Sequence, residues 1–350
     1  MAPRWARSIA AGLGLLAAGW LGPALADVWP GSSWPTASPA SQGVDPGRLA
    51  DALDYGRRHG GAGMVTRHGY LVGSWGDTHA IGAMSSASKA WGSLITGLAI
   101  DDHRLTQDTK AEQIFPDFGA LPRSNPPAWR QQVTIHELLT MTAGFGSNSP
   151  AYPPLKFQPG TVWFYSNGSA NWLADAVLLA YHHDLKDVFE QRILDPIGAR
   201  DFDWRYDVYR TKELDGLPRR EFASGMGASV DTQAPVGLLM LRHGDWEGRQ
   251  LISQAYVADA TRPQADVART RLDDSCAGQN GRYGLLWFTN VDGKMRGVPR
   301  DAFFQWGAHD VFTLVVPSLD LVASRQGHAL GNGCYEVLQP LMDLIVGAVH

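Results

Sequence analysis

The chain has 350 residues, of which 44% are hydrophobic and 19% are charged, and its formal net charge is −5 at pH 7. These values are typical of a globular protein, and the acidic balance argues against nucleic acid or an anionic membrane as the main partner. The length is sufficient for one large core or for two interlocked lobes.

The first 26 residues predict a cleavable signal peptide. They contain Arg4 and Arg7 and no acid, then an apolar stretch over residues 9–21, and they end in Ala-Leu-Ala. This stretch is shorter than the ~20 residues of a spanning helix, and no cysteine follows for lipid attachment. We therefore expect an exported protein, periplasmic or secreted, without a membrane anchor; a retained anchor is the alternative. Cleavage changes the net charge from −5 to −7, because two arginines leave.

Residues 27–45 are rich in Pro, Ser, Gly and Trp, which predicts an irregular segment before the folded domain. A helix is expected over residues 46–59, because proline favours the first helical turn. Two β-type runs, residues 64–67 and 70–75, flank His68-Gly69 and predict a hairpin.

Ser86-Ala87-Ser88-Lys89 opens an apolar, helix-prone run over residues 90–100. In a helix that begins near Ser86, Lys89 lies three residues on and shares a face with the serine, so hydroxyl and amine can meet. A serine hydroxyl needs an adjacent base to become a nucleophile, and Lys89 is that base if burial lowers its pKa from about 10.4. The alternative is a simple helix cap, because this spacing also occurs by chance.

The next part of the chain has helical patterns, over residues 134–141, 170–181, 185–194 and 235–242. Within it, His182-His183-Asp184 does not predict a metal site, because adjacent histidines on a helix point about 100 degrees apart. His136-Glu137 is interpreted as structural. We expect neither a metal nor a cofactor.

Tyr165 and Asn167 lie two residues apart in a predicted loop and can point the same way. A phenol held near a cation can carry a proton between a nucleophile and a leaving group. The asparagine offers both a donor and an acceptor. The alternative is a turn whose aromatic side chain packs in the core.

Strand patterns return after Cys276, over residues 283–289, 302–306, 312–316 and 319–324, and a helix is expected over residues 335–349. Strands at both ends and helices between them predict an α+β fold with one sheet built from both chain ends. The expected sheet lobe is about 46–85 and 276–350, with an inserted helical lobe at about 86–275. Ser86 would lie at a cleft between the lobes.

Gln305-Trp306-Gly307-Ala308-His309 is a third candidate element, within the late strands. Small residues there let a substrate approach an edge strand, and a nearby amide can face a developing oxyanion. The alternatives are a glycine that marks a bulge, and a catalytic imidazole at His309.

Cys276 and Cys334 are the two cysteines of the chain. In an exported protein such a pair most simply forms one disulfide, and two free thiols are the alternative. Two cysteines without the matching histidine spacing do not predict a zinc site.

In this order the three elements resemble the signature of the serine β-lactamase and penicillin-binding-protein superfamily. That signature is S-x-x-K, then Y-x-N or S-x-N, then a strand triad of K-T-G type. Here the motifs are Ser86 to Lys89, Tyr165 to Asn167 and Trp306-Gly307-Ala308, and the resemblance covers roughly residues 40–350. It implies an antiparallel sheet flanked by helices beside an all-helical region, and an acyl-enzyme mechanism.

The resemblance also implies a role for each residue. Ser86 is the nucleophile and Lys89 the general base, while Tyr165 relays protons to the leaving group and later helps to activate water. Asn167 orients Lys89 or the substrate. The backbone amides of Ser86 and His309 form the oxyanion hole.

The third motif departs from the family pattern. Trp306 stands where penicillin-recognising members have lysine or histidine, and Ala308 replaces the final glycine. An indole cannot pair with a substrate carboxylate as a cation does, so Trp306, Gly307 and Ala308 favour a less charged substrate. A tryptophan here is similar to the carboxylesterase-like and 6-aminohexanoate-dimer-hydrolase-like branches.

We therefore expect an exported serine hydrolase that acts on a small-molecule ester or amide. One alternative is a β-lactamase or DD-peptidase, which the departure at Trp306 disfavours. The other is a non-catalytic envelope protein that uses the same fold for binding, which the intact set of Ser86, Lys89, Tyr165 and Asn167 disfavours.

Overall fold

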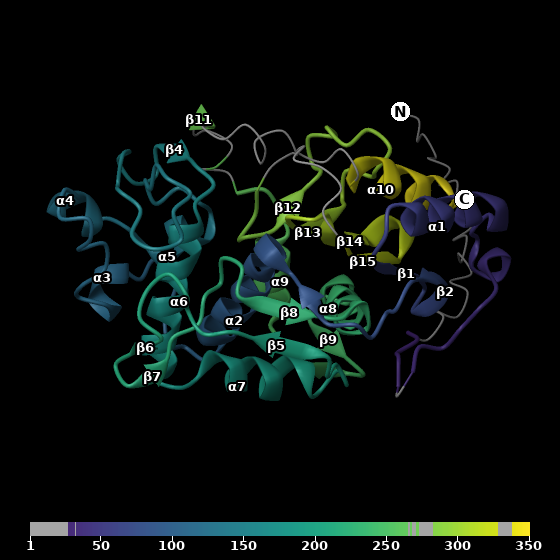
Figure 1. The fold of residues 1–350 in the computed structure, drawn as a ribbon, viewed down its shortest axis with the longest axis horizontal. Helices are drawn as coiled ribbons and strands as arrows, with labels where there is room; N and C mark the ends of the chain where they lie inside the picture. The colour runs from purple at the N-terminus through teal and green to yellow at the C-terminus, as the bar shows by residue number, and fades with distance from the viewer. Residues whose placement is uncertain (1–26, 32, 265–266, 268–270, 273–282, 328–337) are drawn as a thin grey trace, which may run out of the picture.

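The computed structural model describes residues 27–31, 33–264, 267, 271–272, 283–327 and 338–350 (Figure 1). The predicted signal peptide, Cys276 and Cys334 lie outside the described residues. Signal cleavage and the disulfide therefore stay predictions.

The main sheet has six antiparallel strands in the order β12-β13-β14-β15-β1-β2. Its strands are β1 (Ala62–Arg67), β2 (Tyr70–Trp75), β12 (Phe288–Thr289), β13 (Phe303–Gly307), β14 (Val311–Val316) and β15 (Leu321–Gln326). β1 pairs directly with β15, so strands from the two ends of the chain meet inside the sheet. This confirms the predicted sheet built from both ends.

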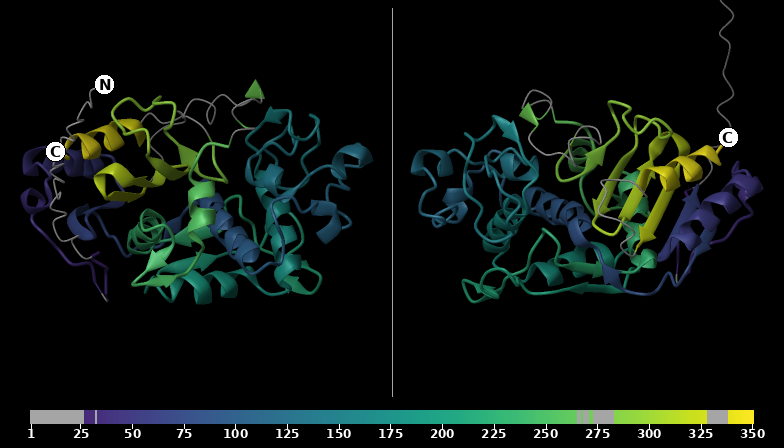
Figure 2. Two further views of the ribbon diagram at one scale, coloured as in Figure 1. Left: turned by 180° about the vertical axis from the view of Figure 1, so that it is seen from behind. Right: turned by 45° about the horizontal axis from the view of Figure 1, so that its top comes forward.

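Helices cover both faces of this sheet (Figures 1 and 2). α1 (Pro46–Arg58) and α10 (Leu338–Gly347) pack together on one face, and α8 (Val230–Leu241) packs against β1, β14 and β15 on the other. α1 begins at the predicted proline and is capped by Asp45, whose carboxylate accepts the N–H of Arg48 at 2.9 Å. Because α8 comes from the middle of the chain, the sheet lobe also uses a central segment; the lobe boundaries stay predictions.

The remaining elements lie beside the sheet. Their helices are α2 (Ser88–Asp101), α3 (Ala111–Ile114), α4 (Pro127–Arg130), α5 (Ile135–Leu139), α6 (Asn167–Tyr181), α7 (Leu185–Phe189) and α9 (Gln254–Ala260). Their short strands are β3 (Gly82–Ala83), β4 (Val162–Trp163), β5 (Phe202–Trp204), β6 (Glu213–Leu214), β7 (Leu217–Pro218), β8 (Met226–Ala228), β9 (Asp245–Trp246), β10 (Arg249–Gln250) and β11 (Arg271–Leu272). Among the helices that the structure describes, none combines the length and apolar character of a membrane span.

Several element boundaries differ from the predicted ones for local reasons. α6 begins at Asn167 instead of residue 170, because the Ser166 hydroxyl accepts the N–H of Ser169 and caps the helix. α8 likewise begins five residues early, behind Ser229. The predicted strand over residues 283–289 is reduced to β12.

Two predicted placements near the site were also wrong in detail. Ser86 lies in a 3₁₀ turn, Ser85–Ala87, which leads into α2. Ala308 and His309 lie in the turn after β13, not within the strand. His309 has φ +70°, a left-handed conformation that fits a tight turn and not a ladder.

A buried ionic network holds the segment that follows α7 against α6. The Asp175 carboxylate accepts hydrogen bonds from Arg219 at 2.9 and 2.6 Å and from Arg210 at 2.6 Å. Arg210 also pairs with Asp207 at 2.7 Å, and all four side chains are almost completely buried. This arrangement leaves each buried charge paired and fixes residues 207–219 against the helix.

Asp175→Ala is expected to lower the free energy of unfolding by about 3–5 kcal/mol, because it leaves two buried guanidinium groups without their shared carboxylate. Urea denaturation measures the loss. The matched control is Asp54→Ala, which removes an exposed pair with Arg57 and should cost at most about 1 kcal/mol. Equal effects of the two substitutions would contradict a structural role for the buried network.

Candidate active site

The first turn of α2 buries Lys89 directly behind Ser86. Every residue from Ser88 to Ala99 is buried, and Lys89 is 1% exposed. Its Nζ lies 3.1 Å from Ser86 Oγ. The predicted contact between serine and lysine is therefore present, although the serine lies in the turn before the helix.

Two further acceptors surround the same amine. Lys89 Nζ lies 2.7 Å from Asn167 Oδ1 and 2.7 Å from the carbonyl oxygen of Ala223. Asn167 Nδ2 donates to the carbonyl of Asn148 at 3.3 Å, which fixes the amide with its oxygen toward the lysine. Asn167 is the first residue of α6 and contacts Lys89, while its role in orienting the lysine stays a prediction.

These three contacts suit both states of the amine, because an ammonium donates to all three oxygens and a neutral lysine donates to two of them. A neutral amine has two N–H groups and one lone pair, and neither the amide oxygen nor the carbonyl oxygen can donate to it. If the two N–H groups bond Asn167 and Ala223, the lone pair faces the hydroxyl of Ser86. That is the arrangement of a general base with its nucleophile.

Burial explains how the amine reaches this state. Loss of solvation lowers the pKa of Lys89 from 10.5 to about 7, and the nearby Glu221 carboxylate opposes this by raising it. Glu221 is itself fully buried, accepts a hydrogen bond from Arg205 Nε at 2.9 Å, and forms an ion pair with the Arg205 guanidinium at 2.8 Å. Neutral Lys89 is therefore well populated near pH 7.

Tyr165 lies on the other side of the amine. Its ring centroid is 4.9 Å from Lys89 Nζ, and the ring stacks on Phe288 at 6.4 Å. Phe288 in turn meets the Trp306 ring edge-on at 6.0 Å. The three aromatic side chains form one wall, so Trp306 reaches the site through Phe288.

Gly307 brings strand β13 against the serine. A Cβ at this position would lie 2.2 Å from the carbonyl oxygen of Met84 and 3.1 Å from the backbone nitrogen of Ser86. Only glycine permits this close approach. Ala308 and His309 follow in the exposed turn, and the oxyanion hole of the Ser86 and His309 amides stays a prediction.

Arg325, on β15, fixes the turn that follows β13. Its guanidinium donates to the carbonyls of His309 at 3.2 Å and Asp310 at 2.7 Å, and also to His59 and Gly60. Through these four carbonyl oxygens, Arg325 holds the turn in a fixed position relative to β1 and β15.

Some residues around Lys89 belong to no sequence pattern that would predict their place in the site. Ala223 supplies a backbone carbonyl, which no side-chain type reveals. Asn171 accepts the N–H of Ala223 at 3.0 Å and donates to the Pro150 carbonyl at 2.9 Å, so it positions that carbonyl. Its spacing of four residues from Asn167, on one face of α6, is the signal that could have found it.

Other polar residues noted in the sequence lie elsewhere. Asp184 pairs with Arg220 at 2.7 Å, and His182 and His183 are largely exposed beside single carboxylates. Within the described part of the chain, no group of three or more His, Cys, Asp or Glu side chains could hold a metal ion.

The acylation rate should rise with pH through a midpoint near 7, because protonated Lys89 cannot accept the serine proton. Below that midpoint the rate should fall about tenfold per pH unit. Pre-steady-state labelling of Ser86 between pH 5 and 9 measures the profile. A rate that is flat below pH 7 would contradict this assignment of the base.

Asn167→Asp provides the sharper form of this test. The aspartate keeps an acceptor beside Nζ but adds a negative charge, which favours the ammonium and should raise the midpoint by at least about one pH unit. The variant should lose activity at pH 7 and recover it at higher pH. Asn148→Asp is the control, since it adds the same charge one hydrogen bond further away and should shift the midpoint less.

Comparisons with known proteins place the chain in a wider group. The family model described as beta-lactamase matches residues 47–325. No curated protein matches the sequence. A beta-lactamase crystal structure from Mycobacterium bovis superposes with a TM-score of 0.65 at 19% identity, over 85% of this chain and 98% of that one.

Two further structures are similar in fold. A Bacillus anthracis protein proposed to be a 6-aminohexanoate-dimer hydrolase has a TM-score of 0.67 and 18% identity, over 89% of this chain and 87% of that one. A mutant simvastatin synthase from Aspergillus terreus has a TM-score of 0.67 and 17% identity, over 86% and 96%. At such identities the likeness establishes the fold alone, and it agrees with the predicted β-lactamase and transpeptidase-like architecture.

Proposed function

Since the chain belongs to the beta-lactamase family, we propose that it is an exported serine hydrolase that cleaves an ester or amide through an acyl-enzyme intermediate. The observation that carries the proposal is the hydrogen-bond pattern at Lys89. Two fixed acceptors and one hydroxyl surround the buried amine, at 2.7, 2.7 and 3.1 Å. Because burial lowers the pKa of this amine to about 7, its neutral form can accept the proton of the Ser86 hydroxyl.

Acylation follows from this geometry. Ser86 Oγ attacks the substrate carbonyl carbon while its proton passes to Lys89 Nζ. The carbonyl oxygen takes up the negative charge and is stabilised by the proposed amides of Ser86 and His309. Tyr165 transfers a proton to the leaving alcohol or amine as the bond to the carbonyl carbon breaks, and the acyl group remains on Ser86.

Deacylation uses the same groups in the reverse sense. A water molecule gives up a proton to the Tyr165 and Lys89 pair and attacks the acyl carbon. The bond to Ser86 Oγ then breaks, and the serine regains its proton. The net reaction consumes one water molecule and releases a carboxylic acid together with an alcohol or amine.

The aromatic wall formed by Tyr165, Phe288 and Trp306 supports the proposal that the protein does not bind its substrate through a carboxylate. An aromatic ring at the third motif cannot form the charge-assisted pair by which a cation holds a penicillin carboxylate. The proposal therefore favours neutral esters or amides over β-lactams and peptidoglycan peptides.

Export and the disulfide belong to the same proposal. The basic start and apolar core of residues 1–26 support secretion, and an oxidising compartment would allow Cys276 and Cys334 to pair.

Ser86→Ala is expected to abolish both ester turnover and covalent labelling by a fluorophosphonate, because it removes the serine hydroxyl that lies 3.1 Å from Lys89 Nζ. Circular dichroism should confirm that the variant is folded. The matched control is Ser85→Ala, which should still be labelled. Unchanged labelling of Ser86→Ala would overturn the assignment of the nucleophile.

A substrate panel separates the proposal from its closest rival. Short-chain p-nitrophenyl esters and linear amides should give a burst followed by turnover, at rates well above cephalosporin hydrolysis. Cephalosporin hydrolysis with negligible ester cleavage would instead identify a β-lactamase. A folded protein that none of these compounds acylates would indicate a binding protein.

A further inference from the structure

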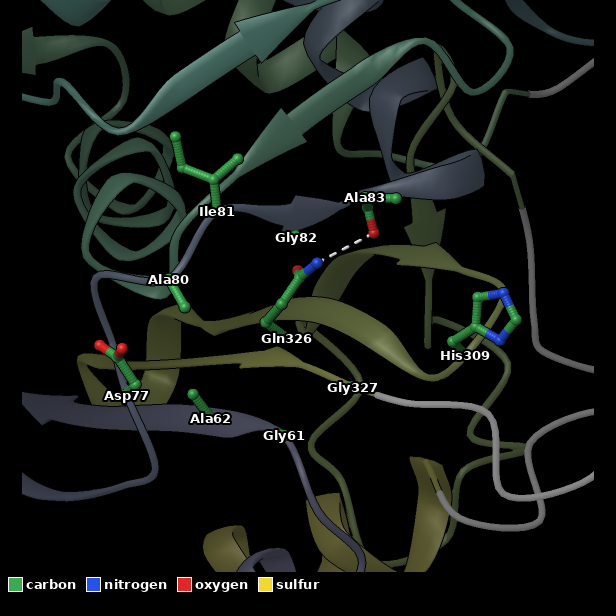
Figure 3. A pocket seen from close by; sticks show the side chains of 10 residues that line it. All are labelled: Gly61, Ala62, Asp77, Ala80, Ile81, Gly82, Ala83, His309, Gln326 and Gly327. Carbon is green, nitrogen blue, oxygen red and sulfur yellow. Dashed lines mark hydrogen bonds between the residues drawn. The ribbon is translucent and has the colours of Figure 1, made fainter.

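A cavity of about 450 Å³ is lined by Ala83 and by His309 in the turn after β13, and it contains none of the four predicted catalytic side chains. Three parts of the fold enclose it: the start of β1, the segment that leads to β3, and the ends of β13 and β15 (Figure 3). Its lining residues are Gly61, Ala62, Asp77, Ala80, Ile81, Gly82, Ala83, His309, Gln326 and Gly327. A volume of this size suits a small organic group.

The chain connects this cavity to Ser86 along two paths. Ala83 lies three residues before the serine, and His309 lies two residues after Gly307. The β13 backbone at Gly307 in turn approaches the Ser86 nitrogen closely. The cavity therefore opens beside the proposed oxyanion hole.

Its position identifies which half of the substrate it faces. The leaving group must lie toward the proton donors, Lys89 and Tyr165. Neither these residues nor Phe288, which stacks on Tyr165, line the cavity. The acyl group is the other substituent of the carbonyl carbon, so it points away from Lys89 and Tyr165. The cavity lies on this acyl side of the carbonyl carbon.

The walls indicate the chemistry of the occupant. Most of the described lining residues are small or apolar, none is lysine or arginine, and Asp77 is their one carboxylate. Such a lining disfavours an anionic acyl group, because a carboxylate would lose solvation and meet another negative charge.

Gln326 adds a polar group to this lining. Its Nε2 donates to the Ala83 carbonyl at 2.9 Å (Figure 3). Its Oε1 accepts from Gln233 at 3.0 Å. Within the described residues, the second N–H of this nearly buried amide makes no hydrogen bond. That N–H can serve an acceptor on the occupant.

The cavity is held rigidly by close backbone contacts. A Cβ at Gly61 would lie 2.1 Å from the Gln326 carbonyl oxygen, and one at Gly327 would lie 2.1 Å from the His309 carbonyl oxygen. These glycines let the backbones of β1, β15 and the β13 turn pack directly against one another. A preformed pocket of this kind selects by shape as well as by charge.

We infer that this cavity is the acyl-group subsite, and that it takes a compact, uncharged acyl chain carrying a hydrogen-bond acceptor. The inference rests on the proposed function and specifies its substrate. The leaving group occupies the opposite side, against the aromatic wall of Tyr165, Phe288 and Trp306.

Filling the cavity tests this assignment. Ala80 is exposed at its rim, so Ala80→Phe should fold and block long acyl chains. The ratio of kcat/KM for p-nitrophenyl hexanoate to that for p-nitrophenyl acetate should fall at least about tenfold, because the two esters share a leaving group and differ only in the acyl chain. Ala62→Leu narrows the cavity from β1 and should change the ratio in the same direction.

Val208→Phe is the matched control, since Val208 is 57% exposed and does not line the cavity. It should leave the ratio within about twofold of the wild type. If both cavity variants keep the wild-type ratio of kcat/KM for hexanoate over acetate and are still labelled by a fluorophosphonate, the cavity is not the acyl subsite. The proposed function would then still stand. A wild-type protein that is neither labelled nor active on any ester would overturn both.

Asp77→Asn tests the charge selectivity. The Asp77 side chain accepts the N–H of His79 at 3.1 Å through Oδ1, which an asparagine can still do, so the substitution removes the charge alone. The wild type should prefer a p-nitrophenyl butanoate ester over the corresponding hemisuccinate, and the variant should reduce that preference by about threefold or more. An unchanged preference would show that Asp77 does not face the acyl group.

Discussion

The burial of one amine organises the candidate active site. Lys89 is withdrawn from water by α2, and the cost of burying a charge there lowers its pKa to about 7. Its three neighbours then decide what the neutral amine does, because two of them accept hydrogen bonds and the third is the Ser86 hydroxyl. Without burial the amine would be an ammonium, and the serine would have no base.

The surrounding fold supplies those neighbours from distant parts of the sequence. α6 provides Asn167, and the segment after α7 provides the Ala223 carbonyl, which Asn171 holds in place. The network around Asp175 ties that segment to the same helix. On the opposite side, β13 approaches Ser86 through Gly307, so sheet and helices meet at this serine.

Much of this could be predicted from local sequence patterns. The hairpin of β1 and β2, the start of α1 at Pro46 and the return of strands near the end of the chain all follow from short-range preferences. The serine, lysine, tyrosine and asparagine could be recognised because their spacing and order carry chemical meaning. α6 and α8 begin earlier than predicted because serine caps were not recognised as their starts.

Other features depend on tertiary contacts that no local pattern contains. The Ala223 carbonyl is a backbone atom, and Glu221 is an acid whose burial follows from the packing of its whole segment. The conformation of the turn at His309 depends on Arg325, which donates hydrogen bonds to its carbonyls from another strand. The cavity lined by His309 and Gln326 is likewise formed by segments that meet only in the folded chain.

The central claim is that Lys89 is a neutral base near physiological pH. An NMR titration of the protein with ¹³C-labelled lysine measures this directly, with the Lys89 signal assigned by its loss in Lys89→Ala. A midpoint near 7 is the expected result. A midpoint close to the ordinary lysine value of about 10.4 would contradict the account, because the amine would then be charged and unable to activate Ser86.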